Sequence, residues 1–390
     1  MDQAANKIAI FAVSILALVI IGYIYAGDMP MGIAASTSIG DPLPPLVFIP
    51  GIKGSVLSDP QGRWCWLTWW QALGFSSPEL SLPLHWEGNV QQSDALVPIA
   101  PLRTVAMRDI YASFLDWAVT SGRSVHPFAY DWRRDNLETV GKFVAFLETV
   151  SQQHGGARVQ VVGHSMGGLI SFVALNRRPD LVHSALFAGV PFGPHISFLE
   201  DMHVGTAAGL NSRILSPQVL FTFVSVYSLF PLEPSESALK DQDGNPIPHD
   251  WYSAKDWERR KLGIFAMIER AEVSREQRAH LRNALRQARE FRSLMVRSRK
   301  NSFQYPPIAV LASDTRQTLS AVVKGGRGAV RGWDFQEAPK EPGDGRVPFV
   351  RALPPQGVPY VVYKTDREHG DLLNDISLVS TILKHLCKTP

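Results

Sequence analysis

The segment GHSMGG, residues 163–168, has the residue types and spacing of a serine nucleophile on a sharp turn. Ser165 is the centre of a G-x-S-x-G pattern, directly after the apolar run RVQVV and before the helical pattern LISFVALNRR. A serine held between a strand and a helix needs small neighbours, because the backbone is strained there and the next turn passes close by. The segment therefore predicts a nucleophile elbow. A glycine-rich turn with an incidental serine is the alternative.

The serine would need a histidine to accept its proton and a carboxylate to orient that histidine. In this arrangement the order along the chain is serine, acid, histidine. His369 and His385 follow the last apolar run, and His369 lies in the loop TDREHGDLL, from which a base reaches the top of a sheet, whereas His385 is interpreted as structural. Asp314 ends the run PPIAVLASD and Asp344 lies in the loop EPGDGRVP. Both acids follow a predicted strand or precede the next one, so chain position leaves both open.

Ester attack also creates an oxyanion, which two backbone N–H groups must stabilise. The amide of Met166, directly after the nucleophile, is the first predicted donor. The second is expected in FIPGIKGS, the loop after the first apolar run, where the amide of Ile52 is preferred. Pro50 in that loop has no N–H group to donate.

These groups can meet only if a sheet brings its strand ends together, and the chain contains a series of short apolar runs that predict such strands. Helical patterns lie between them: residues 137–153 carry Val140, Phe143, Val144 and Leu147 on one face. Such alternation is typical of a mostly parallel α/β sheet covered by helices on both sides. The runs are residues 45–51, 124–132, 158–165, 184–192, 306–314 and 358–364.

The regular alternation stops between residues 194 and 305, which we predict to be a cap inserted into the sheet domain. Its last part is rich in arginine, with Leu281 and Leu285 one helical turn apart. An amphipathic helix with a solvated arginine face is the favoured interpretation, and contact with phospholipid headgroups is the alternative. The sheet domain would then consist of residues 45–193 and 306–390.

The N-terminus predicts a membrane anchor. Residues 8–26, IAIFAVSILALVIIGYIYA, contain no charge, and a bilayer-spanning helix needs roughly 20 such residues. We predict an uncleaved anchor in residues 1–27 and a linker in residues 28–44; a cleaved signal peptide, and hence a secreted protein, is the alternative. Lys7 precedes the run and Lys53 is the first cation after it. The positive-inside rule therefore places the N-terminus in the cytoplasm and the rest in an extracytoplasmic or lumenal compartment.

The overall composition is that of a globular protein, with 45% hydrophobic and 19% charged residues. A formal net charge of +3 is too small in 390 residues to indicate nucleic-acid binding. The two cysteines, Cys65 and Cys387, have neither CxxC spacing nor a disulfide framework around them, so we expect free thiols. No metal and no diffusible cofactor are expected.

The motifs together resemble those of the lecithin:cholesterol acyltransferase family, which also contains group XV phospholipase A2 and phospholipid:diacylglycerol acyltransferase. They occur in the family's order and cover about residues 45–385. As a set they are far more specific than G-x-S-x-G alone. The motifs are PLVFIPGIKGSVL, PFAYDWRRD, VVGHSMGGLI, GVPFGP, SVYSLFP, DWYSAKDW, GDGRVP and EHGDLL.

The resemblance implies an α/β-hydrolase fold. It favours Asp344 over Asp314 as the acid, because the family's G-D-x-x-V-P aspartate falls on Asp344. The motif YDWR is interpreted as structural, with a buried pair of Asp131 and Arg133 that fixes a loop beside the site. The roles implied by the resemblance are nucleophile for Ser165, acid for Asp344, base for His369 and oxyanion amides for Ile52 and Met166.

Tryptophans cluster in the segment WCWLTWW, residues 64–70. In the family the chain here, about residues 55–90, forms a membrane-contacting or lid excursion, so Trp66, Trp69 and Trp70 become candidates for lipid contact. With Leu73 they recur at helical spacing, consistent with one apolar helix face. Packing against the sheet domain or lining an acyl pocket is the alternative.

The leading hypothesis is a membrane-associated serine hydrolase or O-acyltransferase that acts on lipid esters, a phospholipase A or lipid acyltransferase, through an acyl-enzyme on Ser165. Its partners would be a lipid ester and a membrane. One alternative is a carboxylesterase or thioesterase that acts on small molecules. Another is a catalytically silent lipid-binding protein that keeps the fold.

Overall fold

The computed structural model describes residues 43–193, 195–232, 238–268, 272–296 and 304–388. The predicted anchor, residues 1–27, and nearly all of the predicted linker, residues 28–44, lie outside these ranges. Within the described part of the chain, no helix is long and apolar enough to cross a membrane.

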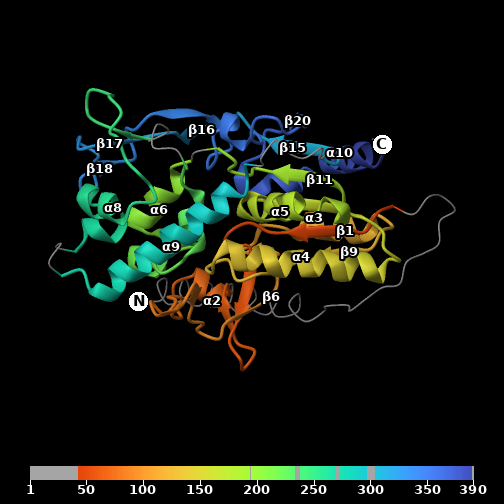
Figure 1. Ribbon diagram of the computed structural model, residues 1–390, viewed down its shortest axis with the longest axis horizontal. Coiled ribbons are helices and arrows are strands. Elements are labelled where there is room, and N and C mark those ends of the chain that lie inside the picture. Colours follow the sequence, from red (N-terminus) through yellow and green to blue (C-terminus); the bar gives the residue numbers. More distant parts are fainter. Residues whose placement is uncertain (1–42, 194, 233–237, 269–271, 297–303, 389–390) are drawn as a thin grey trace, which may run out of the picture. The chain divides into compact units, whose positions relative to one another are not determined.

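A six-stranded sheet forms the centre of the fold, in the order β20-β15-β11-β10-β1-β9 (Figure 1). All neighbouring strands are parallel. Each strand overlaps one of the predicted apolar runs, so those strand predictions are confirmed. The strands are β1 (Leu46–Ile49), β9 (Val125–Pro127), β10 (Val159–His164), β11 (Val182–Ala188), β15 (Ile308–Ala312) and β20 (Val361–Lys364).

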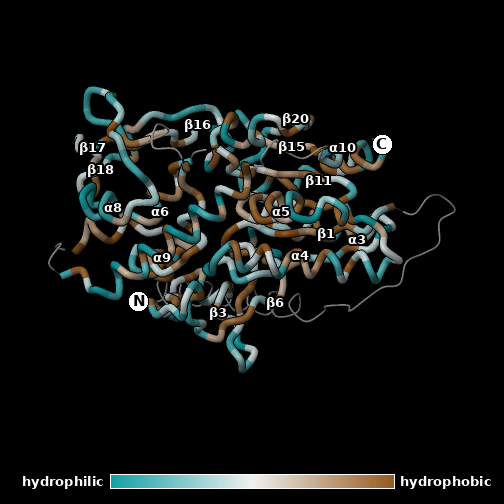
Figure 2. Tube along the Cα trace, in the orientation of Figure 1, coloured by the Kyte–Doolittle hydropathy of each residue, from teal (hydrophilic) through white to brown (hydrophobic). Residues whose placement is uncertain are grey.

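Helices cover both faces of this sheet, as strand β1 shows. Val47 and Ile49 belong to the buried cluster that contains side chains of α4 and α5, whereas Leu46 and Phe48 belong to the cluster of α3 and α10. A strand that is buried on both faces is therefore mostly apolar, and Figure 2 shows hydrophobic residues concentrated along α5, β1 and β11. The helices are α3 (Ala112–Thr120), α4 (Asn136–Gln153), α5 (Ser165–Arg177) and α10 (Ile376–Lys388).

Helix α4 forms where the sequence predicts it. The Asp135 side chain accepts a hydrogen bond from the Leu137 amide and so caps the first turn. Val140, Phe143 and Leu147 are fully buried, which confirms the predicted apolar face.

The segment after β1 leaves the central sheet and forms a small antiparallel sheet of order β3-β2-β6. Helix α2 (Trp69–Ala72) follows β3. The prediction that Trp66, Trp69 and Trp70 share one helix face is wrong. The Thr68 side chain caps the helix together with Gln71, so the helix begins only at Trp69. The strands are β2 (Ser55–Ser58), β3 (Trp64–Trp66) and β6 (Val97–Pro101).

Strand alternation alone would put Trp64 and Trp66, two positions apart in β3, on the same face. The β2–β3 register is irregular between Leu57 and Ser58, the residues paired with these tryptophans, and the two differ strongly in exposure. Trp66 is 3% exposed and Trp64 is 48% exposed. Trp69 and Trp70 stay 40% and 52% exposed. Trp66 is therefore a packed residue, and only the two tryptophans of α2 remain as surface candidates from the predicted set.

The predicted cap contains most of the remaining helices. Its strand β14 (Leu239–Lys240) pairs in parallel with β17 (Val322–Lys324), beyond residue 305. The packing of the cap therefore extends past its predicted boundary. The cap helices are α6 (Ser197–Val204), α7 (Pro217–Phe221), α8 (Ala254–Arg260) and α9 (Arg275–Ser293).

Helix α9 is the arginine-rich amphipathic helix expected from the sequence. A capping box of Ser274 and Gln277 begins it, and Leu281 and Leu285 are buried on its inner face.

Cys65 and Cys387 are free, as predicted. The other strands are β4 (Trp86–Glu87), β5 (Val90–Gln91), β7 (Thr104–Val105), β8 (Arg108–Asp109), β12 (Thr206–Ala208), β13 (Asn211–Leu215), β16 (Arg316–Leu319), β18 (Trp333–Asp334) and β19 (Lys340–Gly343). The short 3-10 helices are η1 (Pro179–Leu181), η2 (Ser225–Leu229), η4 (Gly263–Ala266), η5 (Phe349–Ala352) and η6 (His369–Asn374).

Candidate active site

Ser165 lies at the turn between β10 and α5, with a backbone φ of 50° that places it in the left-handed region. Its glycine neighbours are needed for their size. A β-carbon on Gly163 would lie 2.7 Å from the α-carbon of Gly168, and one on Gly167 would overlap the Pro50 carbonyl oxygen. The strand, the strained turn at Ser165 and the helix that follows thus have the geometry of the predicted nucleophile elbow.

The structure brings Ser165, His369 and Asp344 together from three separate segments. The His369 Nε2 atom is 3.0 Å from Ser165 Oγ, and its Nδ1 atom is 2.8 Å from Asp344 Oδ2. The His369 amide also donates to the Asp344 carbonyl oxygen at 2.9 Å. This backbone bond fixes the loop after β19 against the start of η6, so the two side chains meet in a defined orientation.

The surroundings of Asp344 keep it ionised. The residue is 2% exposed, and burial raises its pKa. The charge and hydrogen bond of His369 and the amides of Val347 and Arg346 outweigh that effect, so the pKa lies below the ordinary range of an aspartate. Those amides donate to Oδ1 at 2.7 and 2.9 Å. Oδ2 is left to accept from His369 Nδ1–H, so in the neutral imidazole Nε2 presents its lone pair to the Ser165 hydroxyl.

The other acid and histidine considered from the sequence lie elsewhere. Asp314 accepts a hydrogen bond from the Lys364 ammonium at 2.6 Å, in a largely exposed ion pair. His385 lies in α10, and its ring centroid is 6.5 Å from that of Tyr363. Among the residues that the structure describes, neither Asp314 nor His385 lines the cavity beside Ser165.

His164, directly before the nucleophile, was not singled out from the sequence. Its Nδ1 atom is 2.7 Å from the Tyr111 hydroxyl, and its Nε2 atom is 2.9 Å from the His369 carbonyl oxygen. The Tyr111 oxygen also accepts from the Gly51 amide at 3.1 Å. Burial, with the nearby His369, lowers the pKa of His164 to about 3, so the ring is neutral.

The direction of these hydrogen bonds follows from the His369 carbonyl oxygen at the end of the chain. A carbonyl oxygen can only accept, so His164 Nε2 donates to His369, and Nδ1 therefore accepts from the Tyr111 hydroxyl. The result is a continuous chain from the Gly51 amide to the backbone of His369. The histidine of G-H-S was a visible signal for it, whereas no local pattern pointed to Tyr111.

The two residues predicted to supply oxyanion amides lie beside the serine. Met166 is the second residue of α5, at the helix terminus where amide groups point outward. Ile52 follows β1 and lines the same cavity as Ser165. The approach of this loop is close, because a β-carbon on Gly51 would lie 2.9 Å from the Ser165 β-carbon. That these amides stabilise an oxyanion stays a prediction.

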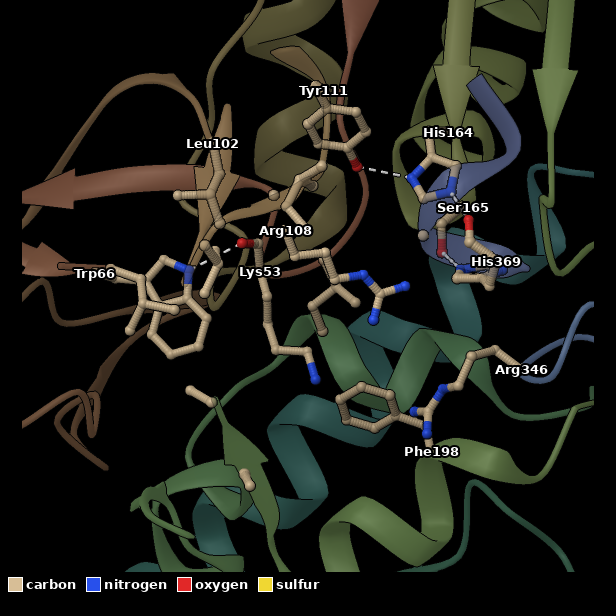
Figure 3. A pocket seen from close by; sticks show the side chains of 18 of the residues that line it. Lys53, Trp66, Leu102, Arg108, Tyr111, His164, Ser165, Phe198, Arg346 and His369 are labelled. Carbon is tan, nitrogen blue, oxygen red and sulfur yellow. Dashed lines mark hydrogen bonds between the residues drawn. The ribbon is translucent and has the colours of Figure 1, made fainter. Parts of the chain in front are cut away.

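A cavity of about 630 Å³ opens in front of Ser165 and His369 (Figure 3). Much of its wall is apolar, including Trp66, Leu102 and Phe198. The Trp66 indole N–H donates to the Lys53 carbonyl at 2.9 Å, which fixes the ring at the wall. For Trp66, lining of the pocket therefore explains its position better than contact with lipid.

The YDWR motif is structural, as expected. Arg133 is fully buried, and its guanidinium lies 2.8 Å from Asp131 and 2.6 Å from Asp94. It also donates to the Leu80 carbonyl at 3.0 Å. The buried pair with Asp131 is confirmed, and the unforeseen contacts with Asp94 and Leu80 tie the segment after β1 to the sheet.

Comparison with known proteins agrees with this fold. Residues 44–207 match the family model described as alpha/beta hydrolase fold. A chain from the crystal structure of the Tle4–Tli4 complex superimposes with a TM-score of 0.53, covering 89% of this chain and 98% of that chain. At 13% identity that likeness shows the fold alone.

Two sequence relatives are more informative. The chain is 31% identical over 109 residues to the lysosomal phospholipase A and acyltransferase of Mus musculus, a match that covers 26% of each protein. It is 34% identical over 64 residues to lecithin-cholesterol acyltransferase-like 4 of Arabidopsis thaliana, covering 16% of this chain and 12% of that protein. The chain thus matches about a quarter or less of the length of these relatives. With the α/β-hydrolase fold, these matches support a lecithin:cholesterol acyltransferase-like α/β-hydrolase family for the chain.

Proposed function

We propose that the protein is a serine-dependent lipid esterase that releases the acyl group to water or transfers it to an alcohol. The observation that carries this proposal is the hydrogen-bonded series from Ser165 Oγ through His369 to Asp344, at 3.0 and 2.8 Å. It opens into a cavity with apolar walls, which suits a fatty acyl chain. The two relatives named as phospholipase or acyltransferase support the lipid class.

In the proposed mechanism, Ser165 Oγ attacks the ester carbonyl carbon while His369 Nε2 takes the hydroxyl proton. The amides of Ile52 and Met166 donate to the oxyanion of the tetrahedral intermediate. When the intermediate collapses, the bond to the leaving oxygen breaks and His369 returns the proton to that oxygen. Asp344 stabilises the imidazolium throughout and holds its ring in place.

The acyl-enzyme is then resolved by a second nucleophile. Water or an alcohol loses its proton to His369 and attacks the acyl carbon, and the same proton returns to Ser165 as the product leaves. Water gives a free fatty acid, and an alcohol gives a new ester. One covalent intermediate therefore accounts for both hydrolysis and transfer.

Product analysis with acyl-labelled phospholipid tests the proposal. We expect labelled fatty acid and lysophospholipid without added alcohol. With a long-chain alcohol we expect a labelled ester whose rise matches the fall in free acid, because both acceptors compete for one acyl-enzyme. Turnover of dissolved short-chain esters or thioesters only would favour the small-molecule esterase, and a folded protein that resists fluorophosphonate would favour the silent lipid-binding protein.

We further propose that the enzyme works at a lipid surface, through an α2 patch of exposed apolar side chains. It consists of Trp69, Trp70 and Phe75, which are 40%, 52% and 73% exposed. The Trp70 and Phe75 rings are 5.6 Å apart and meet edge to face. Indole rings favour the boundary between water and lipid.

The double change of Trp69 and Trp70 to serine should lower activity on phospholipid vesicles by about tenfold or more while leaving activity on a dissolved short-chain ester near wild type. Only the vesicle assay requires docking. Residues 8–26 are deleted in both proteins, so that the predicted anchor cannot hold the variant at the membrane.

Val119→Ser serves as the matched control, because Val119 is exposed on α3 and lies outside the α2 patch. It should leave both activities unchanged. An equal fall on vesicles and on dissolved ester in the double variant, with a lowered melting temperature, would show that the tryptophans stabilise the fold and do not dock.

A further inference from the structure

The cavity beside Ser165 has a one-sided charge pattern. Among the described residues that line it are Lys53, Arg108 and Arg346, and no carboxylate. Figure 3 shows these three side chains reaching the space in front of Ser165 and His369. The cavity therefore presents positive charge to whatever occupies it.

The carboxylates that balance these cations lie outside the cavity lining. Asp201 accepts from Arg346 at 2.6 and 3.3 Å, and the Lys53 ammonium is 3.8 Å from the same carboxylate, beyond hydrogen-bond distance. Arg108 pairs with Glu368, which is also absent from the lining. One buried carboxylate thus faces two cations, and Lys53 keeps donor capacity for a further acceptor.

The backbone of Lys53 indicates that its position matters. It has a φ of 64°, in the left-handed region where a glycine or asparagine is less strained than a lysine. Trp66 holds it by donating to its carbonyl oxygen at 2.9 Å, and the Gly54 amide closes the turn on the Gly51 carbonyl at 3.0 Å. Strain of this kind persists only where surrounding contacts hold the backbone in place.

We propose that Lys53, with Arg346 beside it, binds the phosphate of an anionic lipid ester, and that the cationic wall selects such a lipid over a zwitterionic one. An ammonium and a guanidinium donate charge-assisted hydrogen bonds to phosphate oxygens. A quaternary ammonium headgroup would instead meet the cations with no carboxylate in the lining to offset their repulsion. The inference rests on the proposed function, since it assigns the polar part of the substrate whose ester reaches Ser165.

Binding of two monomeric probes to the full chain tests this without turnover. Octyl phosphate carries the proposed anion as a phosphate monoester, and octylphosphocholine carries a phosphate diester whose choline adds a cation. Calorimetry should show octyl phosphate binding about tenfold more tightly, the difference expected for a hydrogen-bonded charge pair. Lys53→Asn, which suits the left-handed backbone, should remove most of that preference, and Lys53→Arg should retain it.

Lys142→Asn is the matched control, since it removes the same charge from an exposed lysine of α4 that pairs with Glu138. It should leave the preference intact. An equal loss in both asparagine variants would mean bulk charge and overturn the site, as would a wild-type protein that binds both probes alike. Octanoate forms a third arm: if it binds more tightly than octyl phosphate, the cations hold the released fatty acid and the headgroup assignment is refuted.

The two proposals fail separately. A protein that prefers octyl phosphate through Lys53 but turns over no lipid keeps the anion site and loses the proposed activity. A protein that hydrolyses phospholipid but shows no Lys53-dependent preference keeps the activity and loses the anion site.

Discussion

Replacing Ser165 with alanine should abolish fluorophosphonate labelling and lower ester turnover by a factor on the order of 10⁵ or more. The acyl-enzyme cannot form without the serine oxygen, because the hydroxyl at 3.0 Å is the group that His369 Nε2 contacts. The fold should persist, since the change removes one oxygen from a largely buried side chain and leaves the strained backbone in place. Single-turnover assays, covalent labelling and a thermal melt would measure the three effects.

Ser171→Ala provides the matched control. Ser171 is equally buried in α5, but its hydroxyl donates to the Gly168 carbonyl at 3.1 Å. Labelling and turnover should survive in that variant. A Ser165→Ala protein that still turned over esters at the wild-type rate would rule out the proposed mechanism.

Changing Asp344 to asparagine should lower kcat by about 10⁴, with little effect on KM. The amides of Arg346 and Val347 both donate to Oδ1, so the asparagine carbonyl oxygen must take that position. Its NH2 group then faces His369 Nδ1 in place of Oδ2. The ring must accept at Nδ1 and carry its proton on Nε2, so it presents a hydrogen to Ser165 and no lone pair.

Asp314→Asn tests the other acid by the same chemical change. Its side chain holds a surface ion pair with Lys364, and such pairs contribute about 0–1 kcal/mol. Activity should stay within about twofold of wild type, because the residue does not reach His369. The opposite ranking of the two variants would assign the acid to the loop after β15.

The strands and the serine were predictable because each carries a local signal. Strands buried on both faces are mostly apolar, and Leu46 to Ile49 show why: successive residues enter opposite covered faces. The motif G-x-S-x-G alone predicts a strained turn between a strand and a helix. The approach of Asp344 to His369 could be anticipated only through the family resemblance, since spacing alone left Asp314 equal to it.

The failures have a different physical origin. Trp66, Trp69 and Trp70 satisfy helical spacing, but Thr68 starts the helix after the first of them, so a cap overrides periodicity. The contact between Tyr111 and His164 joins residues that are 53 positions apart. Side-chain networks over such separations leave no periodic trace, because each partner is locally an ordinary residue.

In the proposed mechanism, the hydrogen-bond chain through His164 restricts where the proton taken from Ser165 can go. The rings of His164 and His369 have centroids 4.9 Å apart, so a proton taken from the serine arrives beside a second imidazole. His164 cannot share it, because Tyr111 occupies its Nδ1 lone pair and its Nε2 already bears a hydrogen. His164 therefore offers no proton acceptor behind the reacting histidine. In that mechanism the positive charge stays on His369, next to the Asp344 carboxylate, and Nε2 returns its proton to an oxygen in the cavity.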